Sequence, residues 1–166
     1  LGFTGNMLGP ELERFVSTIS EAQKLKFSRI QTHDANNEFG FRLKMPMRNT
    51  KRGKIPTSIE FGFASFLSTI TAYKKERVLT EEVRQFVAYK LQDVLFDHIV
   101  NRIQVAFLKH ASTDQNGTKT GKFEGVGDFV CSGGVAANKL LRNKLIHDLD
   151  LGHPLKFHFP DLALCT

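Results

Sequence analysis

The sequence predicts an α/β protein in which a small mixed sheet is flanked by helices. Apolar residues recur at helical spacing from Val83 to Ile103 and again from Leu141 to Leu149. Short alternating or apolar runs, which are typical of strands, lie around these helices. The expected strands are residues 58–63, 126–131 and 155–159. Because 166 residues can bury one core, we expect a single domain over residues 1–166.

The composition is that of a soluble globular chain with an excess of basic residues. Apolar residues make up 41% and charged residues 24%. No apolar run approaches the roughly 20 residues that span a bilayer, so we expect no membrane span. The net charge of +6 favours a polyanionic partner, although most excess charge is simply solvated surface. The chain begins with Leu1 and has no secretory signal, and we expect it to be a piece of a longer protein.

The first helix is predicted to begin at Pro10, which suits the first helical position, and to end near Ala22. The pattern of residues 24–56 is irregular and basic. A basic cluster in this segment consists of Arg48, Lys51, Arg52 and Lys54. We interpret this cluster first as a solvated loop and second as a contact to nucleic-acid phosphates, which lysine and arginine neutralise.

A strand over residues 58–63 is expected to lead into a helix over residues 65–75. The simplest role for Phe61 and Phe63 in this strand is in the core. Thr80 is a good N-cap for the longest helix, which we expect to reach about Ala111. The histidines along that helix share no ligand spacing, and residues 112–122 are interpreted as a polar loop.

A strand, a glycine turn and a helix follow one another from Val126 onward. The strand ends at Cys131, an expected small core residue, and the turn is Ser132-Gly133-Gly134. Two glycines allow positive φ and the close approach of a ligand, because no Cβ stands in the way. A helix that begins there would offer unpaired N–H groups to an anion such as phosphate. A tight connection without any ligand is the alternative interpretation.

The helix after the turn has an apolar face and a basic face. Leu141, Leu145 and Leu149 recur at helical spacing and are expected to be buried. Asn138 is placed one turn into this helix, where its side chain could reach the same ligand. The side chains expected to face outward are Lys139, Arg142, Asn143 and Lys144.

The string Ser-Gly-Gly-Val-Ala-Ala-Asn-Lys-x-Leu-Arg, residues 132–142, resembles the signature of the tRNA threonylcarbamoyladenosine synthases. This TsaD-like family was formerly described as glycoproteases, but no protease metal motif occurs here. The resemblance covers nearly all of the chain and implies the C-terminal lobe of an actin/Hsp70-like ATPase fold. The residues that it implies for binding the nucleotide part of an acyl-adenylate are Ser132, Gly133, Gly134 and Asn138.

The chain departs from the family pattern in two places. The family has Gly-Gly-Pro near the first helix, and its first glycine touches the nucleotide. This chain has Leu8 at that position and retains Gly9, which we keep as a binding candidate. The family also carries Phe-Ser-Phe-Ser-Gly-Leu, where this chain has Gly62, Ala64 and Ser65 in place of Ser, Ser and Gly.

The family implies one divalent metal, iron or zinc, whose ligands are not in this chain. In the family, the segment that corresponds to residues 159–166 runs directly into an Asp-Asn pair whose Asp is a ligand. A His-x-x-x-His pair in the family's N-terminal region supplies the others, and no such pair occurs here. Cys131 with Cys165, and His153 with His158, give no metal spacing. We therefore expect no metal ligand, no catalytic residue and no activity in this chain alone.

The resemblance implies that the intact protein moves threonylcarbamoyl from threonylcarbamoyl-AMP to the adenosine beside the anticodon of tRNA, with the metal as Lewis acid and template. Its partners would be tRNA and an adenine nucleotide, and a homodimer is one possible assembly. Divergence and an isoelectric point of about 9.4 favour the mitochondrial branch, with the cytoplasm as the alternative. The alternative function is a non-catalytic nucleotide-binding or subunit-contact module of the same fold.

Overall fold

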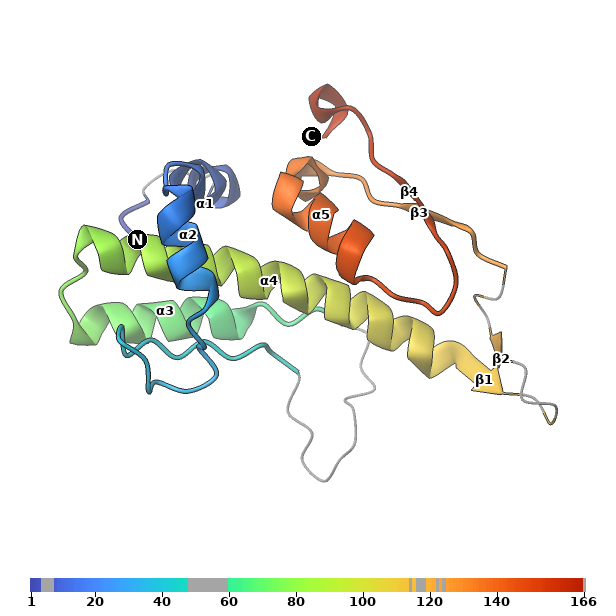
Figure 1. Cartoon of the computed structure of the whole chain (residues 1–166), viewed down its shortest axis with the longest axis horizontal. Coiled ribbons are helices and arrows are strands. Elements are labelled where there is room, and N and C mark those ends of the chain that lie inside the picture. The colour runs from blue at the N-terminus through green and yellow to red at the C-terminus, as the bar shows by residue number, and fades with distance from the viewer. Residues whose placement is uncertain are drawn as a thin grey trace. The chain divides into compact units, whose positions relative to one another are not determined.

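The computed structural model describes residues 1–3, 8–47, 60–113, 115, 119–121, 123 and 125–165. The chain forms two compact units (Figure 1). The first comprises Leu1–Asn49 and Gly62–Leu95, and the second comprises Thr50–Phe61 and Phe96–Thr166. The boundary between them lies within the long helix α4, Glu81–His110, which therefore contributes residues to both units.

The first unit contains more helix than the sequence predicts. Its first three helices are α1 (Leu8–Ser17), α2 (Glu21–Ser28) and α3 (Ala64–Glu76). The prediction of one helix ending near Ala22 is wrong, because Ser20 caps a second helix. The Ser20 Oγ accepts a hydrogen bond from Gln23 N at 3.3 Å. As a result, α2 occupies part of the segment that was predicted to be irregular.

An aromatic cluster forms the core of the first unit. The Phe86 ring of α4 stacks on Phe39 with centroids 4.1 Å apart and meets Phe27 of α2 edge-on at 5.4 Å. Phe39 lies outside any helix, in a stretch that the Asn37 side chain holds together. Asn37 Nδ2 donates to Phe41 O at 2.9 Å, and its Oδ1 accepts from Phe39 N at 3.1 Å. Burial of these rings therefore orders residues that have no regular secondary structure.

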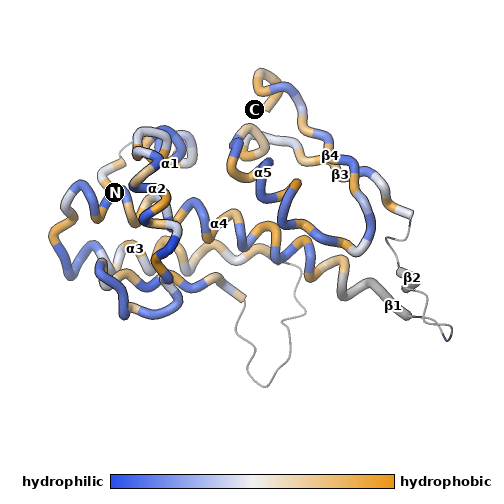
Figure 2. The backbone as a smooth tube through the Cα atoms, viewed as in Figure 1, coloured by the Kyte–Doolittle hydropathy of each residue, from blue (hydrophilic) through white to orange (hydrophobic). Residues whose placement is uncertain are grey.

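The helices α3 and α4 confirm the two helices predicted between residues 65 and 111. α4 begins after Thr80, whose Oγ1 accepts a hydrogen bond from Val83 N at 3.4 Å. Figure 2 shows hydrophobic and hydrophilic positions alternating along α4, as its predicted periodicity requires.

The segment before α3 differs from the prediction. None of the described residues of the expected strand, Glu60–Phe63, belongs to a strand. Phe61 and Phe63, which were expected in the core, are 50% and 43% exposed. The alternation misleads because no described strand pairs with this segment. Phe61 instead meets the buried His98 of α4 edge-on, with ring centroids 6.3 Å apart.

The second unit contains a short parallel sheet, the helix α5 (Lys139–Asp148) and the C-terminal part of α4. β3 (Asp128–Val130) pairs with β4 (Lys156–His158), and Phe129 lies opposite Phe157. α5 lies between these two strands in the chain and contacts η2, the 3-10 helix Gly134–Ala137 (Figure 1). Both predicted strands are confirmed in shortened form, and the connection between them runs through α5, as a parallel pair requires.

The described strands form two separate two-stranded sheets rather than one mixed sheet. β1 (Ala111–Thr113) and β2 (Lys119–Gly121) make the second, antiparallel pair, in the segment interpreted as a polar loop. The α/β class is confirmed. Within the described part of the chain, no helix is both long enough and apolar enough to cross a membrane.

Candidate functional site

The turn after β3 is exposed and open. Cys131 N donates a hydrogen bond to His158 O at 3.1 Å, which extends the pairing of β3 with β4 to the edge of the turn. Gly133 follows with a φ of +93°, a left-handed conformation that residues with a side chain rarely adopt. A Cβ at Gly133 would meet nothing within 4 Å, and Ser132 and Gly134 are exposed as well. A ligand can therefore reach the backbone of this turn directly.

The helix does not begin immediately after the glycines. A short 3-10 helix, η2 (Gly134–Ala137), comes first, and Asn138 is the N-cap of α5. Asn138 is only 6% exposed, and its Oδ1 accepts hydrogen bonds from Leu140 N at 2.9 Å and Leu141 N at 3.2 Å. The predicted location of Asn138, one turn inside the helix, is therefore wrong.

This cap changes the argument for anion binding. The N–H groups of Leu140 and Leu141 already have a partner in Asn138, so the start of α5 is not a set of free donors. The accessible donors lie earlier, in the exposed backbone of residues 132–134. The missed signal was Asn138 itself, because asparagine is among the preferred N-cap residues. Its binding role stays a prediction, and that role would fall to the amide nitrogen Nδ2.

α5 presents the predicted apolar face, but not the predicted basic face. Leu141, Leu145 and Leu149 are buried, as expected. Two of the four side chains expected to face outward are instead half-buried. Lys144 forms an ion pair with Asp97 of α4. Arg142 Nε donates to Ala136 O at 2.6 Å, and its Nη2 donates to Pro160 O at 2.9 Å.

Cys131 is half-buried rather than a core residue. Burial raises the pKa of its thiol, and the Arg142 guanidinium only partly offsets that shift. A thiol with a raised pKa is mostly protonated at neutral pH, and the protonated thiol is a poor nucleophile. The position next to the turn therefore does not make Cys131 a reactive group.

The described residues do not fit a metal centre. Among them, no group of three or more His, Cys, Asp or Glu side chains is placed to hold a metal ion. The two histidines near β4 have different partners. His158 Nε2 lies 2.6 Å from Asp128 Oδ1, and His153 Nε2 lies 2.8 Å from the carbonyl oxygen of Val126.

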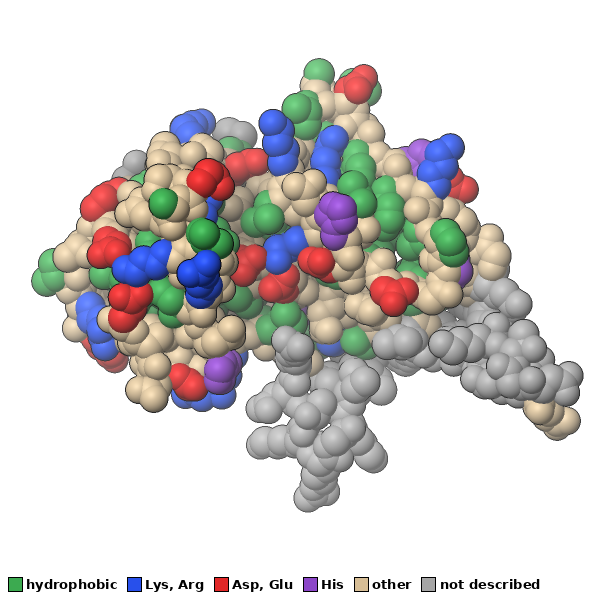
Figure 3. All heavy atoms as spheres, in the orientation of Figure 1, with side chains coloured by type: hydrophobic (Ala, Val, Ile, Leu, Met, Phe, Trp, Pro, Cys, Tyr) green, Lys and Arg blue, Asp and Glu red, His purple; other side chains and the backbone are tan. Residues whose placement is uncertain are grey.

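Of the other predicted site residues, only Gly9 is among the described residues. Gly9 is exposed in α1 of the first unit, and a Cβ there would meet nothing within 4 Å. The predicted basic cluster, Arg48, Lys51, Arg52 and Lys54, lies outside the described residues. On the face seen in Figure 3, basic and acidic side chains are interspersed over the first unit, so this face carries mixed charge.

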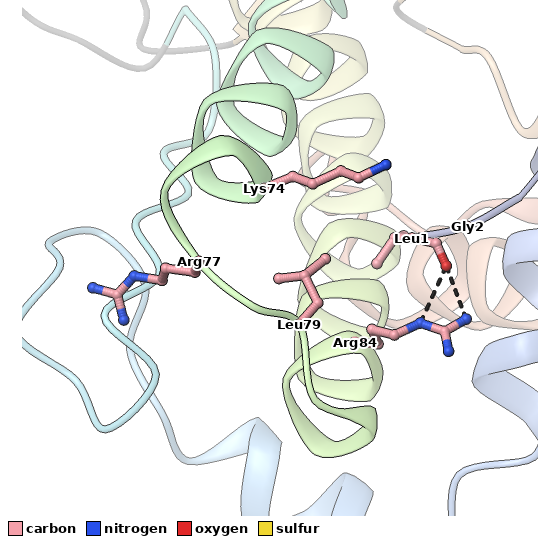
Figure 4. A pocket seen from close by; sticks show the side chains of 6 residues that line it. All are labelled: Leu1, Gly2, Lys74, Arg77, Leu79 and Arg84. Atoms are coloured by element: carbon pink, nitrogen blue, oxygen red, sulfur yellow. Dashed lines mark hydrogen bonds between the residues drawn. The ribbon is translucent and has the colours of Figure 1, made fainter.

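A basic pocket in the first unit was not predicted. It has a volume of about 350 Å³ and is lined by Leu1, Gly2, Lys74, Arg77, Leu79 and Arg84 (Figure 4). Arg84 donates to the Leu1 carbonyl oxygen from Nε at 3.2 Å and from Nη2 at 2.9 Å. Arg77 points away from Lys74 in Figure 4, and its Nη1 donates to Phe39 O at 3.2 Å. These two arginines therefore hold backbone segments in place.

The chain is similar to one family of known proteins. The family model described as tRNA N6-adenosine threonylcarbamoyltransferase matches residues 7–166. A relative of that description from Nitrosomonas europaea is 26% identical over 126 residues, which cover 76% of this chain and 31% of the relative. One from Wolbachia pipientis wMel is 28% identical over 127 residues, which cover 76% and 33%.

A third relative is described as the mitochondrial tRNA N6-adenosine threonylcarbamoyltransferase of Schizosaccharomyces pombe. It is 29% identical over 137 residues, which cover 78% of this chain and 30% of the relative. The chain therefore spans about a third of the length of the curated relatives it matches.

Replacing Asn138 by Ala is expected to lower the free energy of unfolding by about 1 kcal/mol, because α5 loses its N-cap. Asn138→Ser and Asn138→Asp keep an acceptor oxygen and should retain most of that stability. Asn143→Ala, at an exposed position of the same helix, is the matched control and should change stability little. Urea denaturation of the intact protein measures all four variants. Equal stability of Asn138→Ala and Asn143→Ala would contradict the capping role.

Proposed function

This chain belongs to the family of tRNA N6-adenosine threonylcarbamoyltransferases, and we propose that the intact protein transfers threonylcarbamoyl from threonylcarbamoyl-AMP to the adenosine beside the anticodon of tRNA. In this reaction the exocyclic amine of the adenosine attacks the carbamoyl carbon. A carbon–nitrogen bond forms, and the bond from that carbon to the phosphate oxygen of AMP breaks. AMP leaves with the bonding electron pair, and the amine gives up one proton.

The observation that carries the proposal is the open turn at Ser132–Gly134, inside the part of the chain that matches the family. Exposed backbone N–H groups and the Ser132 hydroxyl are hydrogen-bond donors, and phosphate oxygens are strong acceptors. The missing Cβ of Gly133 leaves space for the phosphate of AMP to approach. Asn138 Nδ2 is proposed as a further contact to the nucleotide, and Gly9 of the first unit is kept as a separate candidate for nucleotide binding.

We assign the divalent metal of the proposed enzyme, iron or zinc, to residues outside this chain. The described residues bring no set of three ligands together, so no step of the transfer is assigned to a metal that they hold. When bound, the metal would supply Lewis-acid activation of the acyl-adenylate. The part proposed for this chain is to bind and orient the AMP half of that substrate.

We propose that both units form one domain, the C-terminal lobe of an actin/Hsp70-like ATPase fold. The Schizosaccharomyces pombe relative, which is described as mitochondrial, supports a mitochondrial location for the intact protein, with the cytoplasm as the alternative. A homodimer is one possible assembly.

A second candidate function is a non-catalytic nucleotide-binding or subunit-contact module. Its support is the departure from the family pattern at two places, Leu8 and residues 61–65. The Leu8 side chain is 57% exposed. A transfer assay with intact protein, threonylcarbamoyl-AMP and unmodified tRNA separates the two candidates. Modified adenosine in the digested tRNA, detected by mass spectrometry, supports the enzyme. Binding of AMP without any transfer identifies the module.

AMP is expected to slow amide hydrogen exchange in residues 132–138 of the intact protein, because it covers the exposed turn. Gly134→Val should abolish this protection, since a branched side chain would stand where the ligand approaches. Gly127→Val is the control, because Gly127 lies just before β3, outside the turn, and a Cβ there would meet nothing within 4 Å. Normal protection in a folded Gly134→Val protein would remove this turn from the site.

The affinity for tRNA is expected to fall as salt is added, because binding to phosphates releases condensed cations. In a variant with Ala in place of Arg48, Lys51, Arg52 and Lys54, the plot of log K against log salt should be less steep. Its slope should fall in magnitude by about 0.7–0.9 for each phosphate that the variant no longer neutralises. The control variant carries Ala at four exposed basic positions elsewhere, Arg14, Arg29, Lys75 and Lys156. Equal slopes for the two variants would show that the basic cluster is solvated surface.

A further inference from the structure

Arg142 joins two segments that are separated in the sequence. From α5, its Nε donates to the carbonyl oxygen of Ala136 in η2 at 2.6 Å. On the other side, its Nη2 donates to Pro160 O at 2.9 Å and to Cys165 Sγ at 3.6 Å. The Arg142 guanidinium is therefore hydrogen-bonded both to η2 and to the segment that follows β4.

The connection reaches the glycine turn in one further step. Ala136 N donates a hydrogen bond to Gly133 O at 3.0 Å. Ala136 is therefore bonded to Arg142 through its carbonyl oxygen and to Gly133 through its N–H group. A shift of Ala136 would move the Gly133 carbonyl with it. Because Gly133 has a left-handed backbone and nothing within 4 Å of its Cβ position, no side-chain packing of its own fixes it. Backbone hydrogen bonds have to do so.

The arrangement suits arginine better than lysine. The guanidinium carbon of Arg142 lies over the Phe159 ring, 5.0 Å from the ring centroid. The edge of the guanidinium carries Nε and Nη2, which donate in different directions to the two carbonyl oxygens. A lysine ammonium has no plane to stack and would have to serve both carbonyls from a single atom.

We propose that Arg142 is the positioning residue of the nucleotide-binding turn, holding residues 132–138 in a fixed place relative to the segment 159–165. This inference rests on the proposed function, since it assumes that the turn binds the AMP half of the substrate. The partners of Arg142 are protein atoms of η2 and of residues 159–165, so its proposed role is to position the turn. Arg142 acts through Ala136 O and Gly133 O, and a misplacement of about 1 Å in a positioned group can cost on the order of a hundredfold in rate.

The test uses the intact protein with Arg142→Gln, Arg142→Lys and the control Lys156→Gln. Lys156→Gln removes the same charge from an exposed position of β4 in the same unit. The transfer rate is measured against the concentration of threonylcarbamoyl-AMP. Amide hydrogen exchange is measured without substrate.

Arg142→Gln is expected to raise the KM for threonylcarbamoyl-AMP by about tenfold or more, because the turn is no longer held in place. Exchange should become faster in residues 132–138 and in residues 160–165 together, while the buried part of α5 stays protected. Arg142→Lys should give a smaller change in the same direction, and Lys156→Gln should behave as wild type. A folded Arg142→Gln protein with an unchanged KM, or with faster exchange in only one segment, would overturn the proposal.

Three features keep this test decisive. A purely structural role for Arg142 would lower the amount of folded protein and leave KM unchanged, which counts against positioning. If Arg142→Gln does not fold, the folded Arg142→Lys protein decides by the same two measurements. If wild type transfers nothing, the proposed function fails by itself. The affinity for AMP then replaces KM, and an unchanged Kd in Arg142→Gln overturns the positioning role.

Discussion

Asn138 decides where α5 begins, and the geometry around the turn depends on that start. Its Oδ1 bonds to the N–H groups of Leu140 and Leu141, which fixes the first turn of the helix. From that start, Arg142 lies one turn along and reaches back to Ala136 O, while Leu145 lies one turn further and is buried. Residues 131–133 connect β3 to η2, and Gly133 in this connection has a positive φ of +93°. Asn138, Arg142 and Gly133 are therefore linked: the cap sets the start of α5, and Arg142 on α5 holds Ala136, which bonds to Gly133.

The chemistry offered by this junction is that of binding rather than reaction. Its accessible groups are backbone donors and one hydroxyl at Ser132, none of which is a general base at neutral pH. The Cys131 thiol is adjacent to the turn in the chain, and burial raises its pKa, so it is mostly protonated at neutral pH. Such a site can hold a phosphate and orient what is attached to it, which is the contribution that an acyl transfer needs from its nucleotide-binding half. In the transfer that we propose, activation of the acyl group is assigned to other residues.

The sequence predicts the parts of the fold where burial leaves a periodic pattern. α4 and the buried leucines of α5 follow from helical spacing, and the exposed turn follows from consecutive glycines. The sequence pattern does not reveal α2, because this helix begins at the Ser20 cap and has only a weak apolar pattern. It also misplaces Arg142 and Lys144, because charged side chains are expected in solvent unless tertiary partners are known. Those partners, Ala136 O and Asp97, exist only once the chain has folded.

A structure of the intact protein with a non-reactive analogue of threonylcarbamoyl-AMP tests most directly whether the Ser132–Gly134 turn holds the nucleotide. We expect phosphate oxygens of the analogue at hydrogen-bonding distance, about 3 Å, from backbone nitrogens of this turn. The contacts from Arg142 to Ala136 O and Pro160 O should be preserved in that complex. A well-ordered analogue bound elsewhere, with the turn still open to solvent, would contradict the assignment of the site.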